Sequence, residues 1–306
     1  MWKGVRQVNR REFMLSGAAM AGAAALGGCR ALSGPCERLP YGDTLADRLW
    51  MWGHHRDFFL KSKRTRDRIP KATRIDMADA CIDFGIPNCC CIRCGNRPEK
   101  AELPEYMPQF RRLKRFAWSV TDSAAEKFDE KVEMGFRLAD EYPNLTHFWM
   151  DDYFFEGENS FMQPMEKLVA MKERLVARGM RLASVIYADD NGFKEQFRET
   201  LDLCDEVSCW IWQGRNTGQM TDYIRRLRDF TRRPILLGIY MYDFGGNVQM
   251  TAERMEGQLR SVEGLLDDGA LAGLIFHCTP LVDLDIDAVR ISRAWIKANR
   301  GRRVAS

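Results

Sequence analysis

Paired carboxylates occur in a stretch of this sequence that also carries many aromatic residues, HFWMDDYFFE at residues 147–156. Asp151 and Asp152 follow directly on a run of mostly large apolar and aromatic side chains. Two carboxyl groups held close together can divide the roles of proton donor and nucleophile or base, because mutual repulsion raises the pKa of one of them. The candidate catalytic residues are these two and three further acids: Asp151, Asp152, Asp243, Asp190 and Glu156.

Each of these acids also has a purely structural interpretation. Asp151 and Asp152 could cap the following loop or pair with Arg93, and adjacent residues of a strand point to opposite faces unless the strand ends between them. Asp190 lies in the sequence DDNG, which suits a turn or a helix cap as well as a site. Asp243 precedes the sequence FGG, which suits a flexible substrate loop.

The elements that would position these acids follow a regular rhythm of apolar strand and amphipathic helix. Short, continuously apolar strands that alternate with helices indicate parallel strands buried on both faces. The predicted strands are eight: 48–54, 88–94, 115–121, 146–151, 182–188, 206–212, 235–242 and 271–278. This count and length predict an α/β fold, a single-domain (β/α)₈ TIM barrel. The rival, an open doubly wound sheet, lacks support because no glycine-rich phosphate turn follows the first strand.

The chain divides into one barrel with short flanking segments. We expect a signal peptide at residues 1–28, a linker at 29–44, the barrel at 45–300 and a C-terminal tail at 301–306. No Pro-, Ser- or Gly-rich linker interrupts the rhythm of strands and helices inside the barrel segment.

Aromatic and polar residues gather where the predicted strands end, which is where barrels of this kind carry their chemistry. Sugars bind by laying their apolar faces on aromatic rings, while carboxylates, amides and imidazoles take the hydroxyls. We expect about half of the Trp and Tyr side chains to face a ligand and the others to pack against helices. The candidate substrate-binding residues are Trp52, His54, Arg93, Tyr153, Tyr187, Trp210, Trp212, Gln213, Tyr240, Tyr242 and His277.

In its acids, aromatic residues and barrel rhythm the chain resembles, in a general way, secreted (β/α)₈ glycoside hydrolases, many of which carry a catalytic carboxylate at the end of strand four. The resemblance covers roughly residues 45–300 and implies cleavage of an extracytoplasmic oligosaccharide or polysaccharide through a carboxylate pair. The chitinase-like pattern D-x-x-D-x-D-x-E is absent, because Glu156 follows Asp152 by four positions. The Asn-Glu pair of a larger clan is absent too, because Met150 precedes Asp151. Only the expectation of an acid at this place carries over.

Two other functions fit the same residues. A metal-dependent hydrolase or sugar isomerase could use His54 or His55 with His277 and an Asp from strand four. The two strand-one histidines are adjacent, so the His-x-His pattern of metal-hydrolase barrels is absent. A non-catalytic sugar-binding surface lipoprotein is the third alternative. If the protein is a glycosidase, we expect it to use no cofactor.

The N-terminus carries an export address. Arg10 and Arg11, Phe13 and a short run rich in Ala and Gly resemble a twin-arginine signal peptide, although Asn9 stands where Ser or Thr is usual. The sequence LGGC ending at Cys29 resembles a lipobox, which implies lipidation of Cys29 and a periplasmic or cell-surface protein anchored to the membrane. An ordinary cleaved signal with a chance cysteine is the alternative.

The charge of the chain argues against nucleic acid as a partner. The first 28 residues account for the formal net charge of +3, so the remainder is close to neutral. Nucleic-acid binding depends on an excess of Lys and Arg that neutralises phosphates. The basic cluster at 61–68 is interpreted as a solvated helix face.

The cysteines are interpreted as buried apolar residues rather than as a metal or redox site. The chain has ten cysteines, and Cys91 and Cys94 form a C-x-x-C pair. No second C-x-x-C completes a four-thiolate set. The triplet Cys89 to Cys91 lies in a predicted buried strand, where free Cys behaves as a small hydrophobe.

Overall fold

The computed structural model describes residues 41–56, 58–61, 73–122, 126–154, 161–188 and 193–304. Several predictions from the sequence fall outside these ranges: the signal peptide with its paired arginines, the lipidation site Cys29, the acids Glu156 and Asp190, and most of the basic cluster at 61–68.

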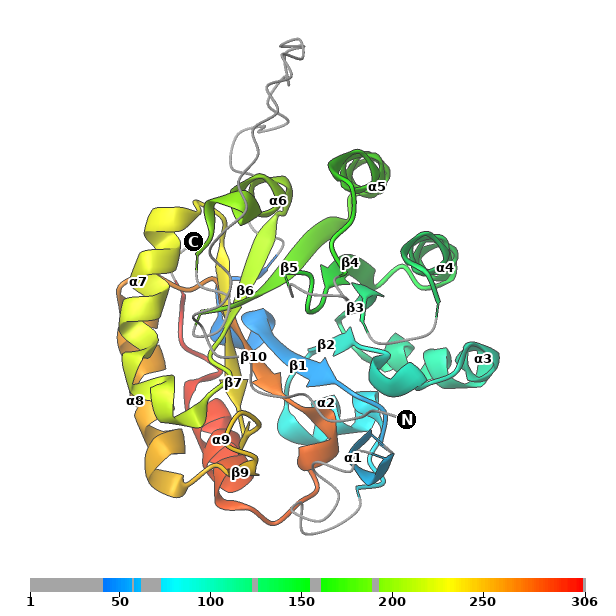
Figure 1. The fold of residues 1–306 in the computed structure, drawn as a ribbon. Coiled ribbons are helices and arrows are strands. Elements are labelled where there is room, and N and C mark those ends of the chain that lie inside the picture. The colour runs from blue at the N-terminus through cyan, green and yellow to red at the C-terminus, as the bar shows by residue number, and fades with distance from the viewer. Residues whose placement is uncertain are drawn as a thin grey trace, which may run out of the picture. The chain divides into compact units, whose positions relative to one another are not determined.

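Eight parallel strands close into a barrel, as the sequence predicts (Figure 1). Each strand pairs with its two neighbours around the ring, with register shifts between β3 and β4, and β1 closes the barrel between β10 and β2. The strands are β1 (Leu49–Gly53), β2 (Asn88–Cys91), β3 (Arg115–Thr121), β4 (Leu145–Met150), β5 (Arg181–Tyr187), β6 (Glu206–Trp210), β7 (Ile235–Tyr240) and β10 (Gly273–His277).

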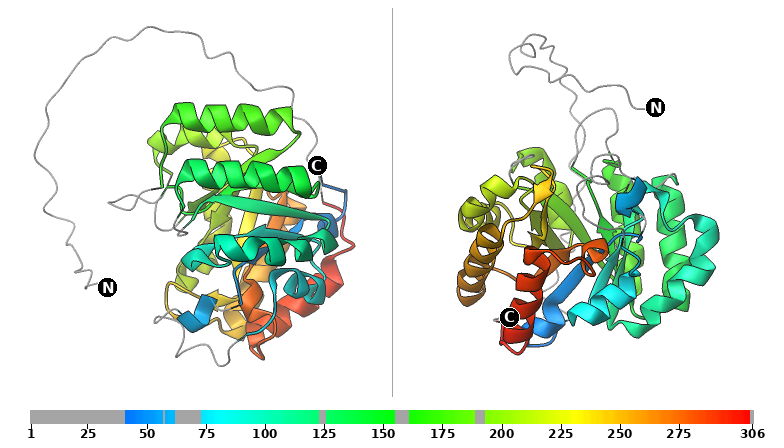
Figure 2. Two further views of the ribbon diagram at one scale, coloured as in Figure 1. Left: turned by 90° about the vertical axis from the view of Figure 1, so that its right-hand side faces the viewer. Right: turned by 90° about the horizontal axis from the view of Figure 1, so that it is seen from below.

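Helices surround the strands on the outside of the barrel (Figure 2). They are α1 (Phe58–Lys61), α2 (Met77–Phe84), α3 (Leu103–Tyr106), α4 (Phe128–Glu141), α5 (Met165–Ala177), α6 (Arg198–Leu203), α7 (Met220–Phe230), α8 (Ala252–Asp267) and α9 (Asp287–Asn299). Their packing follows amphipathic patterning: α7 buries Met220, Ile224, Leu227 and Phe230, which lie on one face of the helix. Within the described residues, none of these helices has the length and apolar character needed to cross a membrane.

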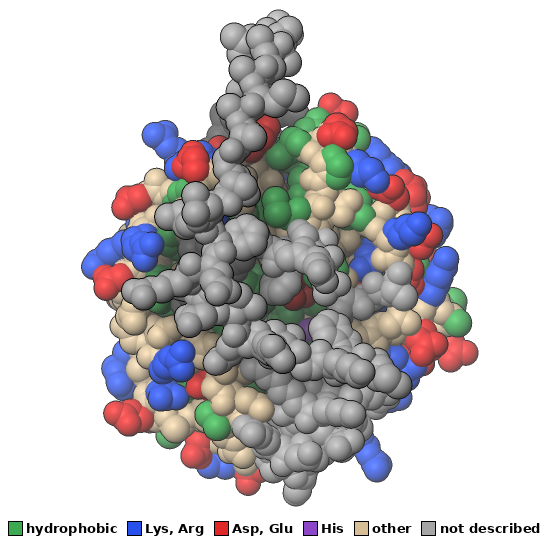
Figure 3. All heavy atoms as spheres, viewed as in Figure 1, with side chains coloured by type: hydrophobic (Ala, Val, Ile, Leu, Met, Phe, Trp, Pro, Cys, Tyr) green, Lys and Arg blue, Asp and Glu red, His purple; other side chains and the backbone are tan. Residues whose placement is uncertain are grey.

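Charged side chains of both signs are interspersed around the periphery of the molecule (Figure 3). Many of them form exposed ion pairs between neighbouring helices, such as Arg174 with Glu133 and Arg293 with Asp83. Exposed pairs of this kind contribute little to stability individually. The stability of the fold therefore depends mainly on what is packed inside.

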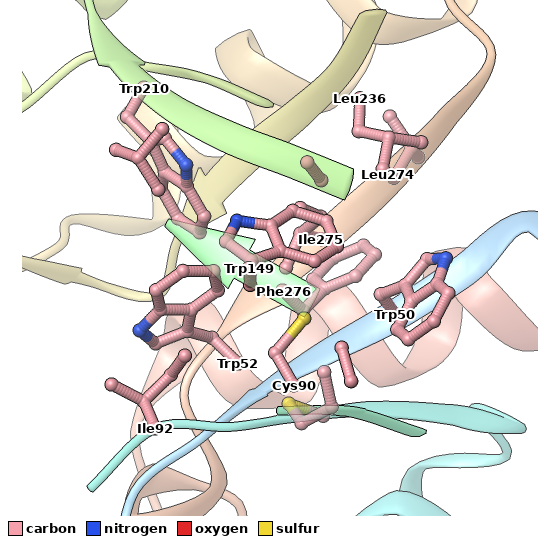
Figure 4. Close-up of a cluster of buried hydrophobic side chains, with 14 of the residues drawn as sticks. Trp50, Trp52, Cys90, Ile92, Trp149, Trp210, Leu236, Leu274, Ile275 and Phe276 are labelled. Atoms are coloured by element: carbon pink, nitrogen blue, oxygen red, sulfur yellow. The ribbon is translucent and has the colours of Figure 1, made fainter. Parts of the chain in front are cut away.

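Four tryptophans fill the interior of the barrel (Figure 4). Trp149 lies against both Trp50 and Trp52, each at 5.9 Å between ring centroids, and Trp52 lies 5.0 Å from Trp210. All four indoles are buried. Gly238 of β7 makes room for one of them, because a Cβ at this position would overlap the indole of Trp210.

The triplet Cys89 to Cys91 forms most of β2 and is fully buried. This confirms the interpretation of the triplet as part of a buried strand. Burial raises the pKa of all three thiols well above the ordinary value. These cysteines are therefore protonated, poorly nucleophilic components of the core.

The end of the barrel at which the strands begin is sealed by polar contacts between distant parts of the chain. Tyr41 donates a hydrogen bond of 2.7 Å from its hydroxyl to Glu206, and Nε2 of His147 lies 3.5 Å from the same carboxyl group. Thr44 forms a β-bridge with Arg303, which joins the segment before β1 to the segment after α9.

Strand seven is shorter than predicted. The segment 235–242 was expected to be one strand, but β7 ends at Tyr240 and a small antiparallel hairpin follows, with β8 (Tyr242–Asp243) and β9 (Val248–Gln249). Asn247, with a φ of 54°, supplies the left-handed backbone conformation in the hairpin turn.

Candidate active site

The end of β4 brings two adjacent carboxyl groups to one place. The strand ends at Met150, so the alternation of side chains between two faces no longer applies to Asp151 and Asp152. Asp152 adopts a φ of 50°, a left-handed conformation that Asp tolerates better than most residues. Both acids consequently line the same cavity.

This cavity has a volume of about 130 Å³ and lies at the end of the barrel where the strands finish. Its walls come from β1, β5, β6, β7 and β10 and from the segments that follow β1, β2, β4, β6 and β8. The lining residues are Trp52, His54, Phe58, Cys94, Asp151, Asp152, Tyr187, Trp210, Trp212, Tyr240, Phe244 and His277.

Hydrogen bonds fix the two acids. The backbone N–H of Asp151 donates to the carbonyl of Thr121 at 3.1 Å, and the Thr121 hydroxyl donates to the carbonyl of Asp151 at 2.7 Å. These bonds tie the end of β4 to the end of β3. The Tyr187 hydroxyl, at the end of β5, donates to Oδ1 of Asp152 at 2.9 Å. Three consecutive strands thus hold the pair.

The two carboxyl groups differ in their electrostatic surroundings. Burial raises the pKa of Asp151 well above its ordinary value, and the nearby charges of Asp152 and Asp122 raise it further. Burial also raises the pKa of Asp152, but the hydrogen bond from Tyr187 opposes that shift. Asp151 therefore retains a proton more readily, whereas Asp152 ionises more readily.

A buried charged pair interacts electrostatically with Asp151; it consists of Asp122, the residue after β3, and Lys131 of α4. Lys131 donates from Nζ to Oδ1 of Asp122 at 2.6 Å and to its carbonyl at 2.9 Å, and both side chains are buried. Because this ammonium group is paired with Asp122, it only partly offsets the repulsion that raises the pKa of Asp151.

Two histidines line the same cavity as the acids. The rings of His54 and His277 lie 5.3 Å apart between centroids, and His54 stacks on Phe58 at 4.2 Å. Burial lowers the pKa of His54 to about 3, and burial together with His54 lowers the pKa of His277 well below its ordinary value. Both imidazoles are neutral at pH 7.

Aromatic rings make up the remaining wall. Trp212 packs edge-on against Tyr187 and Tyr240, with centroids 6.1 and 5.9 Å away, and stacks on Phe244 at 6.0 Å. Tyr240 lies 4.9 Å from His277. The cavity is thus a cage of aromatic rings with a carboxylate pair on one side.

Seven of the predicted binding residues line the cavity together with Asp151 and Asp152, which follow β4. The remaining described candidates lie elsewhere. Oδ1 of Asp243 accepts hydrogen bonds from the backbone N–H groups of Gly214 and Gly246 at 2.9 and 2.7 Å, and Oδ2 lies 3.3 Å from Arg254. The Asp243 carboxylate therefore joins the loops after β6 and β8. It supports Phe244, the next residue, which does line the cavity.

The four other candidates serve neighbouring contacts. Arg93 donates to the carbonyl of Pro98 at 2.9 Å and pairs with Glu126 at 2.9 Å. The Tyr153 hydroxyl donates to the Gln163 carbonyl at 3.2 Å. Tyr242 packs on Phe244, with ring centroids 5.0 Å apart, and Gln213 lies beside Gly245; neither is among the lining residues.

Sequence reasoning missed three lining residues, Phe58, Cys94 and Phe244. Each follows a strand in a loop or a short helix, where no periodic pattern predicts the direction of a side chain. Phe244 alone carried a signal, since it follows the predicted site residue Asp243.

A metal site was an alternative prediction for the same end of the barrel. Among the residues that the structure describes, no group of three or more His, Cys, Asp or Glu side chains is arranged to hold a metal ion. His55, one of the suggested ligands, packs beside Tyr106 and is not a lining residue.

Comparison with solved structures supports the fold. The crystal structure of a "putative alpha-L-fucosidase" from Bacteroides thetaiotaomicron matches with a TM-score of 0.50 and 11% identity, covering 87% of this chain and 98% of that chain. A mutant tryptophan synthase alpha-subunit from Pyrococcus furiosus matches with a TM-score of 0.46 and 10% identity, covering 84% and 98%. At 11% identity, the likeness to the Bacteroides protein shows a common fold only. No protein-family model and no curated protein matches the sequence.

Proposed function

We propose that this protein is a carbohydrate-active hydrolase that cleaves a glycosidic bond of an extracytoplasmic glycan in the cavity at the strand ends. The observation that carries the proposal is the pair Asp151 and Asp152, held by three strands and facing a cage of aromatic rings. Glycoside hydrolysis requires two carboxyl groups, one protonated and one ionised.

The electrostatic surroundings of the two carboxyl groups support different roles for them. Asp151, whose pKa is raised most strongly by burial and by its neighbour, donates its proton to the glycosidic oxygen as the bond to that oxygen breaks. Asp152, held by the Tyr187 hydroxyl, is the ionised group that attacks the anomeric carbon or removes a proton from the attacking water. Burial raises the pKa of Tyr187, so its hydroxyl remains a donor.

The aromatic rings supply the binding surface. Trp52, Trp212 and Tyr240 offer apolar faces on which the C–H groups of a sugar ring can rest. His54 and His277, neutral at pH 7, each offer one donor and one acceptor to sugar hydroxyls. The shared fold with the Bacteroides protein is consistent with the proposal.

The test measures the turnover of chromogenic glycosides and of a panel of glycans. It compares the chain lacking residues 1–28 with its variants Asp151→Asn and Asp152→Asn. We expect each variant to lose activity by about 10²- to 10⁴-fold, the usual contribution of a positioned acid or base. Each should keep the circular dichroism spectrum of the parent protein.

The matched control is Asp129→Asn, which removes an exposed carboxylate on α4 that pairs with Lys167. This control should retain full activity. Parent-level turnover in both cavity variants would contradict the proposed carboxylate pair.

A further inference from the structure

The size of the cavity limits what can enter it. Its volume is about 130 Å³. Drug-sized ligand pockets are typically about 300–1,000 Å³. The cavity therefore has room for one ring-sized group and not for several linked sugars.

The inner end of the cavity is closed. Trp52 and Trp210, which line it, are buried and lie against each other, and Trp149 packs below them. The cavity is therefore closed at its inner end, and a sugar ring that occupies it enters from the mouth of the barrel.

The charges of the wall select against anions. Asp151 and Asp152 are the acidic side chains on the wall, and no Lys or Arg lies among the described lining residues. Described cations at this end of the barrel are already paired: Lys131 with Asp122, Arg254 with Asp243, and Arg93 with Glu126. Neutral imidazoles cannot replace them. A carboxylate, sulfate or phosphate on the sugar would meet the acidic pair without a counter-ion.

Two residues of the wall also have buried polar atoms without a hydrogen bond in the described part of the chain. Nδ1 of His54 and Nδ1 of His277 are buried and make no hydrogen bond within the described part of the chain. Buried polar atoms are usually satisfied, and an exception in a cavity calls for a water, an ion or a ligand group as its partner. Hydroxyls of a neutral sugar can supply both the donor and the acceptor that these rings need.

We propose that the cavity binds one terminal sugar without an anionic group, and that the enzyme releases monosaccharides one at a time from a chain end. The release step rests on the proposed hydrolase function. The binding step depends only on the shape and charge of the cavity.

The first test uses matched 4-nitrophenyl glycosides in both anomeric forms, glucoside against glucuronide and galactoside against galacturonide, together with neutral oligosaccharides. We expect at least one neutral glycoside to be cleaved, with kcat/KM at least 100-fold above that of its uronide. The first product from oligosaccharides should be a monosaccharide. Preferred cleavage of uronides, or larger fragments as first products, would overturn the inference while leaving the hydrolase function intact.

The second test measures sugar binding without turnover, through the fluorescence of the tryptophans on the cavity wall. Neutral monosaccharides should bind to the parent protein at least tenfold more tightly than the matching uronic acids. Asp152→Asn should reduce this difference, because it removes the group that ionises more readily. Selective binding without any turnover would support the binding step and contradict the hydrolase function; equal binding of neutral sugars and uronic acids would contradict the inference.

Discussion

Asp152 shows how a single residue can determine the chemistry of a strand end. Its left-handed backbone, at a φ of 50°, lets two consecutive side chains face one cavity. Conformations of this kind are less stable for residues other than glycine and concentrate at functional sites. Burial raises the pKa of both carboxyl groups, and the approach of Asp152 raises the pKa of Asp151 further.

The raised pKa of Asp151 predicts how the Asp151→Asn variant depends on pH. In the unfolded chain the group has a pKa of about 3.9, so below that value it is neutral in both states and the substitution changes stability little. As the pH rises toward the raised folded-state pKa, ionisation favours the unfolded parent chain by up to about 1.4 kcal/mol per pH unit. The amide does not ionise.

We therefore expect the stability of Asp151→Asn relative to the parent to rise between pH 4 and pH 7. Urea unfolding at several pH values measures this, with exposed Asp129→Asn as the control. A difference that stays constant over this range would show that burial does not raise the Asp151 pKa.

For His54 we expect the stability of the protein to depend on pH in the opposite direction. Its folded-state pKa of about 3 lies below the unfolded value of about 6.5, so the stability it contributes is present above pH 6.5 and is lost as the pH falls. The slope is up to about 1.4 kcal/mol per pH unit for this one group. His54→Gln, which cannot titrate, should lose less stability than the parent between pH 7.5 and pH 4.5 in chemical unfolding. An equal loss in both proteins would indicate that His54 is solvated.

At the level of residues, the sequence predicted which positions carry candidate site residues but not the directions of their side chains. Tyr240, at the last position of β7, lines the cavity, whereas Tyr242 does not, because the strand ends between them and a hairpin begins. Asp243 follows a strand as a catalytic acid would, yet its carboxylate accepts hydrogen bonds from two loops. Such directions depend on loop conformation, which carries no periodic signal.

At the level of elements, the sequence was most informative where burial imposes a pattern. All eight predicted barrel strands occur, and the predicted segment 115–121 matches β3 in both bounds. Both faces of these strands are buried, so their sequences are continuously apolar and easily recognised. The β8–β9 hairpin was missed because it has two residues on each side, and its second strand, Val248–Gln249, is exposed.

The contact between β6 and β7 connects element packing to the cavity. Gly238 of β7 leaves the space that the Trp210 indole fills, and that indole closes the inner end of the cavity. We expect Gly238→Ala to destabilise the protein by about 1–3 kcal/mol, the usual cost of overpacking, and to displace Trp210. Denaturant unfolding and tryptophan fluorescence measure the two effects.

Gly264→Ala is the matched control for this substitution, because a Cβ at that position of α8 meets no atom within 4 Å. An alanine in a helix should stabilise the protein by about 0.5–1 kcal/mol relative to glycine. Equal effects of the two substitutions would contradict the tight contact between Gly238 and Trp210.

At the scale of the whole molecule, the two ends of the barrel have different tasks. The end where the strands finish holds the cavity and its strained, charged residues. The opposite end holds contacts that join distant segments, such as Tyr41 with Glu206 and Thr44 with Arg303. This division is general in barrels of this type, in which one face carries the chemistry and the other stability.

Because the two ends of the barrel differ in this way, we expect Tyr41→Phe to lower the stability of the protein and to leave the cavity unchanged. The Tyr41 hydroxyl donates to buried Glu206, 165 positions away, so its loss leaves a buried carboxylate oxygen without this donor. The expected loss of unfolding free energy is about 1–3 kcal/mol, measured by denaturant unfolding.

Tyr106→Phe is the matched control, because the Tyr106 hydroxyl is buried without a hydrogen-bond partner in the described part of the chain. Its removal should be neutral or stabilising. Sugar binding at the cavity should be the same in both variants and the parent, since neither tyrosine lines it. Weakened binding in Tyr41→Phe alone would show that the two ends of the barrel are coupled.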